Sequence, residues 1–274
     1  MRVGALGALL VLALAGCSAV PDAPFASIAE PPTASAIATP TATATPTPPP
    51  TPAPTAPPPT ATPSPVAAAL VADPCVDRDL PAPSASDRAL TILDRTYALD
   101  PLSTPPDLMP IGEAGFAGDH LVSAAVVADL GALYRDAQAA GLSLLVDSAY
   151  RSYDQQALTF DHWVAQQGYE AALLRTARPG HSEHQLGTAI DFSSPGWTGR
   201  FGDWASETAE GAWLHEHAWE YGFVLSYPWA ADSMTCFGYE PWHYRWIGRG
   251  PAAEQHTSDE VLRTFLERYL IAPS

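Results

Sequence analysis

The most informative segment of this chain is RPGHSEHQLGTAIDF, residues 178–192. Its last residues alternate as in a strand, so Asp191 lies on one face while its neighbours Ile190 and Phe192 lie on the other. Burial of a charged carboxylate between two apolar side chains costs free energy unless a group of opposite charge or a hydrogen-bond donor pairs with it. A metal ion is one such partner, and His184, in the loop before the strand, is a candidate ligand. Taken alone, these residues also fit a loop histidine and a buried carboxylate in a salt bridge.

The stretch YEPWHYRW, residues 239–246, offers groups for the same kind of site. Pro241 favours an extended conformation of Glu240. Around this proline, Glu240 and His243 can converge on one point. A zinc hydrolase needs three protein ligands, an open position for water and a nearby carboxylate that accepts the proton of that water. Glu240 and His243 are therefore candidates for this chemistry.

A third stretch, SAYRSYDQQ at residues 148–156, precedes the other two. In their order and spacing the three stretches resemble the signature blocks of the VanY-type D-alanyl-D-alanine carboxypeptidases, in the LAS group of zinc peptidases. The resemblance extends over residues 90–248. It implies an LAS-type zinc peptidase domain that removes the C-terminal D-alanine from the stem peptides of peptidoglycan.

The resemblance also implies roles for individual residues. It predicts one Zn²⁺ bound by His184, Asp191 and His243, with Glu240 as the catalytic base. Arg151, whose planar guanidinium binds a carboxylate through two hydrogen bonds, is expected to contact the carbonyl or the terminal carboxylate of the substrate. Three further residues are expected at the substrate: Gln156 and Ser182 from the resemblance, and Trp242 from its place beside a metal ligand.

Several other activities are compatible with parts of this pattern. L,D-carboxypeptidases and endopeptidases acting on the same substrates share these motifs, so both remain alternatives. A zinc-bearing wall-binding module without activity is a further alternative, but such a structural site has no need of Glu240 beside the metal. A serine-type D,D-carboxypeptidase requires the pattern Ser-x-x-Lys, and the chain contains no lysine.

The N-terminal part has the composition of an exported, tethered protein. Residues 1–17 resemble a lipoprotein signal peptide, because Arg2 precedes an apolar run that ends in a lipobox at Cys17. Residues 18–72 are rich in Thr, Ala and Pro, which predicts a disordered, extended stalk. The carboxypeptidase domain is expected over residues 73–274. These features predict an extracytoplasmic lipoprotein at the cell envelope, attached to the membrane only through its N-terminal lipid.

The charge of the chain narrows the range of binding partners. The formal net charge is −17, and the thirteen basic residues are all arginines scattered along the chain. Nucleic-acid binding needs clustered basic residues, so nucleic acid is not an expected partner. The partners that the resemblance implies are peptidoglycan stem peptides, and we expect a monomer.

The cysteines of the chain suggest one disulfide. After lipidation of Cys17, the even pair of Cys75 and Cys236 fits one disulfide in an oxidising compartment. Metal binding by these two cysteines is a weaker alternative, because neither has a Cys-x-x-Cys partner.

The spacing of apolar residues predicts an α+β domain with a small antiparallel sheet flanked by helices. Helices are predicted over residues 120–140, 153–167, 169–177 and 206–221, with a C-terminal helix beginning at Thr257 or Ser258. Strands are predicted over residues 143–149, 187–192, 223–227 and 239–246. The tryptophans at positions 204, 213, 219 and 229 are expected in the core rather than at a sugar-binding surface.

Overall fold

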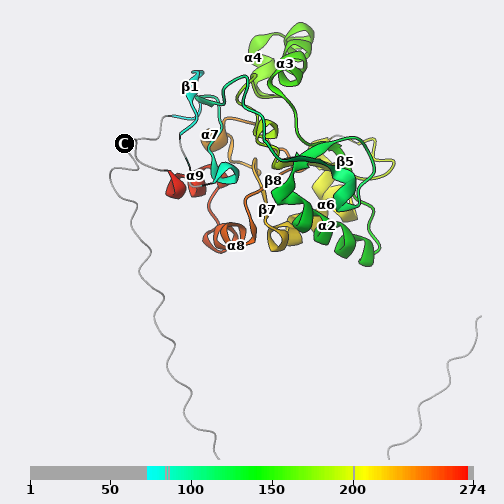
Figure 1. Cartoon of the computed structure of the whole chain (residues 1–274). Coiled ribbons are helices and arrows are strands. Elements are labelled where there is room, and N and C mark those ends of the chain that lie inside the picture. The colour runs from blue at the N-terminus through cyan, green and yellow to red at the C-terminus, as the bar shows by residue number, and fades with distance from the viewer. Residues whose placement is uncertain (1–72, 84, 86, 200, 271–274) are drawn as a thin grey trace, which may run out of the picture. The chain divides into compact units, whose positions relative to one another are not determined.

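The structure is a computed structural model that describes residues 73–83, 85, 87–199 and 201–270. The predicted signal peptide (1–17), with Cys17, and the predicted stalk (18–72) lie outside these residues. The described part is an α+β fold with a small antiparallel sheet (Figure 1), which confirms the predicted fold class. None of the helices in this part of the chain has the length and apolar character that a membrane span requires.

A four-stranded antiparallel sheet brings the sequence motifs together. Its strands in spatial order are β5 (Leu145–Ser148), β6 (Ala189–Ser193), β8 (His243–Trp246) and β7 (Phe223–Leu225). The register places Asp191 opposite His243 on β8 and opposite Ser148 on β5. Three segments that are far apart in the sequence therefore meet at one point of the sheet.

Helix α2 (Ala124–Ala139) packs into the main core with the apolar face of the sheet. Its residues Val126 and Leu130 are fully buried in the same cluster as Ile190 and Phe192 of β6. This arrangement confirms the alternation expected for β6, because the two apolar side chains enter the core and leave Asp191 on the opposite face.

The N-terminal residues of the predicted helix over 120–140 form a strand instead. Leu121–Ser123 is β4, which pairs with β3 (Leu108–Pro110), and Ser123 is the N-cap residue of α2. The apolar residue Val122 fits both a helical and a strand pattern. Residues 121–123 form a strand because their backbone pairs with β3.

The strands predicted over 187–192 and 223–227 are observed as β6 and β7 with shifted ends, and the other two predicted strands differ more. We expected a buried strand over residues 143–149, but Leu145 is 42% exposed because β5 is an edge strand that pairs only with β6. The strand expected over residues 239–246 is limited to β8. The residues before it form a turn, in which the His243 N–H donates to the Glu240 carbonyl.

Helices α3 (Tyr153–Gln167) and α4 (Tyr169–Leu173) form a pair at the top of Figure 1. Helix α3 has the predicted bounds and begins with a capping box between Ser152 and Gln155. Helix α4 is shorter than the predicted range of 169–177. The residues that follow α4 lie in a loop, to which the side chain of Gln156 in α3 donates hydrogen bonds.

The helix predicted over residues 206–221 is broken into three pieces: α5 (Trp204–Glu207), α6 (Ala209–His217) and the 3-10 helix η5 (Ala218–Tyr221). The break is at Thr208, which is extended, with φ −123° and ψ 146°, and accepts a hydrogen bond from a backbone N–H of α6. Because the Thr208 hydroxyl caps the N-terminus of α6, residue 208 cannot at the same time continue α5.

The expected start of the C-terminal helix is wrong. Thr257 and Ser258 are the last residues of α8 (Arg249–Ser258), and their hydroxyls donate to carbonyls of the preceding turn instead of capping a new helix. Asp259 then adopts the left-handed conformation, with φ 55°, which ends α8. A second short helix, α9 (Leu262–Leu266), follows.

The remaining elements are short. They are β1 (Leu80–Pro81), β2 (Tyr97–Ala98), α7 (Asp232–Thr235) and the 3-10 helices η1 (Arg88–Leu90), η2 (Ile111–Ala114), η3 (Glu183–Leu186), η4 (Phe201–Asp203) and η6 (Glu267–Tyr269). A disulfide joins Cys75 to Cys236, the residue after α7, with a Cα–Cα distance of 5.1 Å. It links the first described residues to the loop that leads into the YEPWHYRW stretch.

Candidate active site

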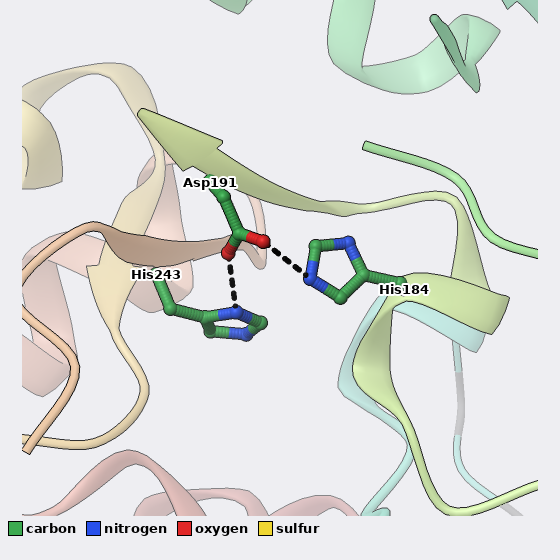
Figure 2. Close-up of side chains that lie close together, drawn as sticks. All are labelled: His184, Asp191 and His243. Carbon is green, nitrogen blue, oxygen red and sulfur yellow. Dashed lines mark hydrogen bonds and ion pairs between the residues drawn. The ribbon is translucent and has the colours of Figure 1, made fainter. Parts of the chain in front are cut away.

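His184, Asp191 and His243 come together on the polar face of the sheet (Figure 2). Asp191 Oδ1 lies 2.9 Å from His243 Nδ1, and Asp191 Oδ2 lies 3.1 Å from His184 Nε2. One ligand atom from each of the three residues lies within 4.8 Å of the others. The two histidines are buried, so these atoms form a compact set of nitrogen and oxygen donors of the kind that binds zinc.

The orientation of His184 indicates that a cation belongs between these side chains. His184 Nδ1 lies 2.5 Å from the carbonyl oxygen of Ala149, which can only accept, so Nδ1 carries the proton. Burial and the charge of Arg151 lower the pKa of His184 to about 4, so the ring is neutral at pH 7. A nitrogen lone pair therefore faces the carboxylate of Asp191 at 3.1 Å. Two acceptors this close repel each other unless a cation lies between them, and Zn²⁺ fits this requirement.

Glu183, which sequence analysis missed, supports His243 from the other side. Glu183 Oε2 accepts from His243 Nε2 at 2.9 Å and from the Ser226 hydroxyl at 2.6 Å, and Oε1 accepts from Arg245 Nη1 at 2.8 Å. Burial alone would raise the pKa of Glu183, but the charge of Arg245 and the hydrogen bond with His243 lower it to about 2. The anionic Glu183 thus keeps a proton on Nε2 and leaves Nδ1 of His243 for the metal.

Arg245 anchors this arrangement in the core. Its side chain is fully buried, and Nη2 donates to the carbonyl oxygens of Ala89 at 2.7 Å and Thr91 at 2.6 Å. The sequence contains a signal for this role, because His243 and Arg245 are two positions apart on a strand and so share a face. A buried arginine needs an anion, and Glu183 is that anion.

Glu240 lies beside the donor set without belonging to it. Its carboxylate oxygen Oε2 is 3.9 Å from His243 Nδ1. In the metal-free protein, burial raises the pKa of Glu240 to about 7, against the lowering effect of the positive charge that His243 carries when no metal is bound. A carboxyl group at this position, in the cleft and beside the donor set, can accept a proton and return it, as a general base requires.

Arg151 and Gln156 act as a unit at the edge of the site. Arg151 Nη1 is 3.6 Å from Asp191 Oδ2, and Arg151 Nε donates to the Gln156 side-chain oxygen at 2.9 Å. Gln156 is fully buried, and its amide nitrogen donates to Thr176 Oγ1 at 3.0 Å and to the Ala177 carbonyl at 2.7 Å. We expected Gln156 to contact substrate, but its burial assigns it to positioning Arg151 and the loop after α4.

A cleft of about 790 Å³ opens at the donor set. The predicted site residues that line it are Arg151, Ser182, His184, Asp191, Glu240, Trp242 and His243. Its walls also include Asp147, Trp163, Arg175, Tyr227 and Tyr239. The cleft is larger than a single amino acid needs, so it can hold several residues of an extended peptide.

Two histidines, an aspartate and a nearby, partly buried glutamate that line one cleft define a zinc metallopeptidase. The model of the VanY family, described as D-alanyl-D-alanine carboxypeptidase, matches residues 119–249. The putative carboxypeptidase YodJ of Bacillus subtilis (strain 168) is 33% identical over 187 residues, which are 66% of this chain and 68% of that protein. The chain belongs to the VanY family.

Further relatives support this assignment. The D-alanyl-D-alanine carboxypeptidase of Enterococcus faecium is 30% identical over 136 residues, but the match covers only 49% of this chain and 40% of that protein. The solved LdcB LD-carboxypeptidase has a TM-score of 0.58 at 33% identity, covering 64% of this chain and 84% of that one. A variant of the vancomycin-resistance D,D-pentapeptidase VanY, in complex with Zn(II), has a TM-score of 0.57 at 26% identity, covering 66% and 99%.

Proposed function

We propose that this chain is a zinc-dependent D,D-carboxypeptidase that removes the C-terminal D-alanine from peptidoglycan stem peptides. The observation that carries the proposal is the position of Glu240, a partly buried carboxylate that lies 3.9 Å from His243 Nδ1 without belonging to the proposed ligand set. A purely structural zinc site has no use for such a group. Membership of the VanY family and the enterococcal D-alanyl-D-alanine carboxypeptidase relative support the substrate class.

His184, Asp191 and His243 are the proposed zinc ligands. When bound, zinc supplies Lewis acidity, which acidifies a water molecule and polarises the scissile carbonyl. Glu240 accepts a proton from the attacking water and returns it to the nitrogen of the leaving D-alanine. No nucleophilic side chain is required.

Arg151 holds the substrate in one of two ways. Its guanidinium either stabilises the oxyanion that develops at the scissile carbonyl or binds the terminal carboxylate. Replacement of Arg151 by alanine would mainly lower kcat in the first case and mainly raise KM in the second. Ser182 and Trp242 line the same cleft and complete the proposed substrate contacts.

The same proposal includes a location. Homologous cell-wall peptidases support an extracytoplasmic site of action. Residues 1–17 would be the signal peptide, Cys17 the lipidated residue, and residues 18–72 the stalk that carries the enzymatic domain, residues 73–274, as a monomer away from the membrane.

An L,D-carboxypeptidase is the second candidate, because the LdcB LD-carboxypeptidase is 33% identical over the matched part. Incubation with two stem peptides, a pentapeptide ending in D-Ala-D-Ala and a tetrapeptide ending in one D-Ala, separates the candidates by the masses of the products. We expect the pentapeptide to lose one alanine and the tetrapeptide to stay intact. Loss of alanine from the tetrapeptide alone would assign L,D activity, and cleavage within cross-linked peptides would assign an endopeptidase. Binding to the wall without any cleavage would assign a non-catalytic module.

A further inference from the structure

The indole of Trp229 lies in solvent, contrary to the expectation that it belongs to the core. The side chain is 78% exposed and lies in the turn between β7 and α7. Single exposed apolar side chains are common on protein surfaces and do not by themselves indicate a binding site. The position of this indole therefore has to be judged from what holds it and what it adjoins.

The ring of Trp229 is held in place rather than free to fold back. It contacts the ring of Tyr239 edge to face, with centroids 5.5 Å apart and planes at 86°. The next residue, Ala230, has a left-handed backbone with φ 59°, and the Ala231 N–H donates to the Pro228 carbonyl at 3.3 Å. A strained residue of this kind persists only where the surroundings impose it, and such residues are concentrated at functional sites.

The indole also contacts a residue of the wall of the catalytic cleft. Tyr239 lines that cleft and directly precedes Glu240, the proposed base. The ring of Trp229 contacts the ring of Tyr239 and is itself exposed, so a solvent-accessible indole lies next to an aromatic ring of the cleft wall. We call Trp229 and Tyr239 together the aromatic platform. A ligand that extends out of the cleft on this side meets the platform.

The chemistry of the chain limits what that ligand can be. With a formal net charge of −17 and no lysine, the protein is repelled by anionic lipid surfaces. An uncharged ligand with an apolar face suits an exposed indole better, because a flat aromatic ring packs against C–H groups while neighbouring hydroxyls stay hydrated. A pyranose ring has both features, and stem peptides are covalently attached to the sugars of the wall glycan.

We propose that the aromatic platform is a glycan subsite, in which Trp229 stacks on a sugar ring of the strand that carries the stem peptide. The inference rests on the proposed function, because it takes the stem peptide as the occupant of the cleft. It predicts that the enzyme distinguishes peptides that are attached to glycan from the same peptides free in solution.

The test compares the purified protein with its Trp229→Ala variant on two substrates: uncross-linked glycan chains carrying pentapeptides, and the same pentapeptide without sugar. We expect Trp229→Ala to lower kcat/KM on the glycan-linked substrate about fivefold, the ratio expected for one aromatic stacking contact. Release of D-alanine from the free peptide should not change, which also shows that the variant is folded. Leu102→Ala, which removes a side chain that is 89% exposed, is the matched control and should change neither rate. Equal effects of Trp229→Ala on both substrates, or no effect on either, would overturn the subsite.

A binding measurement separates this inference from the proposed function. Glycan strands stripped of their stem peptides should bind the unmodified protein and bind Trp229→Ala more weakly, whether or not the protein cleaves any peptide. Vesicles containing phosphatidylglycerol should bind both proteins equally poorly. If Trp229→Ala instead reduces binding to the vesicles and not to the glycan, the platform is a membrane contact and the glycan subsite is wrong. Failure of the unmodified protein to cleave the free pentapeptide would count only against the carboxypeptidase proposal.

Discussion

Asp191 of β6 lies directly opposite His243 of β8, with Asp191 Oδ1 2.9 Å from His243 Nδ1. The backbone hydrogen bonds of two paired strands thus set the separation of two proposed ligands before any metal binds. Only His184 comes from outside the sheet, and the Ala149 carbonyl at the end of β5 orients its ring. A site that is built in advance loses little conformational entropy when it binds zinc.

We expect Asp191→Asn to lose most of its zinc, because a neutral amide cannot balance the charge of the ion. The loss of affinity should exceed the roughly 10- to 100-fold that is typical for removal of an outer hydrogen-bond partner. Metal content after dialysis, measured by mass spectrometry, checks this. Asp147→Asn is the control, since Asp147 lines the same cleft but hydrogen-bonds to the Ser193 hydroxyl. Full zinc content in Asp191→Asn would remove this residue from the ligand set.

Glu240→Gln should keep its zinc and lose most of its turnover. The amide has nearly the same shape as the carboxyl group but cannot accept a proton, so kcat should fall by roughly 100-fold or more. Zinc content and D-alanine release are measured on the same sample, with Glu216→Gln, at a side chain that is 78% exposed, as the control. A zinc-loaded Glu240→Gln variant with near wild-type turnover would show that Glu240 is not the base.

Glu183→Gln should weaken zinc binding although Glu183 is not a proposed ligand. The two carboxylate oxygens accept from His243, Ser226 and Arg245, whereas glutamine offers one acceptor oxygen and turns a donor towards the others. We expect roughly 10- to 100-fold weaker zinc binding. The free energy of unfolding should fall by about 3 kcal/mol, because the charge of Arg245 loses its buried partner.

Competition with a chelator gives the zinc affinity of this variant, and urea denaturation gives its stability. Ser226→Ala is the matched control, because it removes one hydrogen bond to the same carboxylate, should cost about 1 kcal/mol, and should leave the zinc affinity unchanged. Equal zinc affinities of Glu183→Gln and the unmodified protein would show that Glu183 does not set the proton position on His243.

Metal-free protein should show a pH dependence of stability that originates in Glu240. Burial raises the pKa of this carboxyl from 4.5 to about 7 in the folded state. The neutral form is favoured on folding, so this contribution is fully present below pH 4.5 and is lost as the pH rises through 7. The loss amounts to about 3 kcal/mol. Glutamine at this position does not titrate, so Glu240→Gln should gain stability relative to the unmodified protein between pH 4.5 and pH 8. Denaturation of both metal-free proteins at the two pH values gives the difference, and a difference that does not change with pH would contradict the raised pKa.

The bridge between Cys75 and Cys236 should stabilise the fold, because it closes a loop with a sequence separation of 161. Replacing both cysteines by serine should lower the free energy of unfolding by about 4 kcal/mol. Thiol titration of the unfolded, non-reduced protein provides the direct check. Two reactive thiols per chain of the lipidated protein, in which the sulfur of Cys17 is blocked, would show that the bridge does not form.

The motifs predicted the face of Asp191 correctly because alternation along a strand is a local property. The break at Thr208 was not foreseen, since a capping hydroxyl and a mid-helix threonine look the same in a sequence. Glu183 escaped notice because its role depends on Arg245, 62 positions away, which becomes its neighbour only when β8 pairs with β6. Trp229 was misplaced for a similar reason. Whether a tryptophan after a strand turns inward or outward depends on the backbone of the turn, here on the left-handed Ala230.

The bridge from Cys75 to Cys236 also determines where mechanical force enters the enzyme. A pull transmitted through the N-terminal side of the chain reaches the described residues at Asp73 and, two residues later, meets a covalent bond. The load passes into the loop after α7 and is not borne by the short strand β1 (Leu80–Pro81), whose few hydrogen bonds would otherwise peel away first. With the lipid attachment that we propose at Cys17, an enzyme bound to a moving wall would thus be strained next to Glu240. Tension in the cell envelope would then act first on the loop that leads to the proposed base.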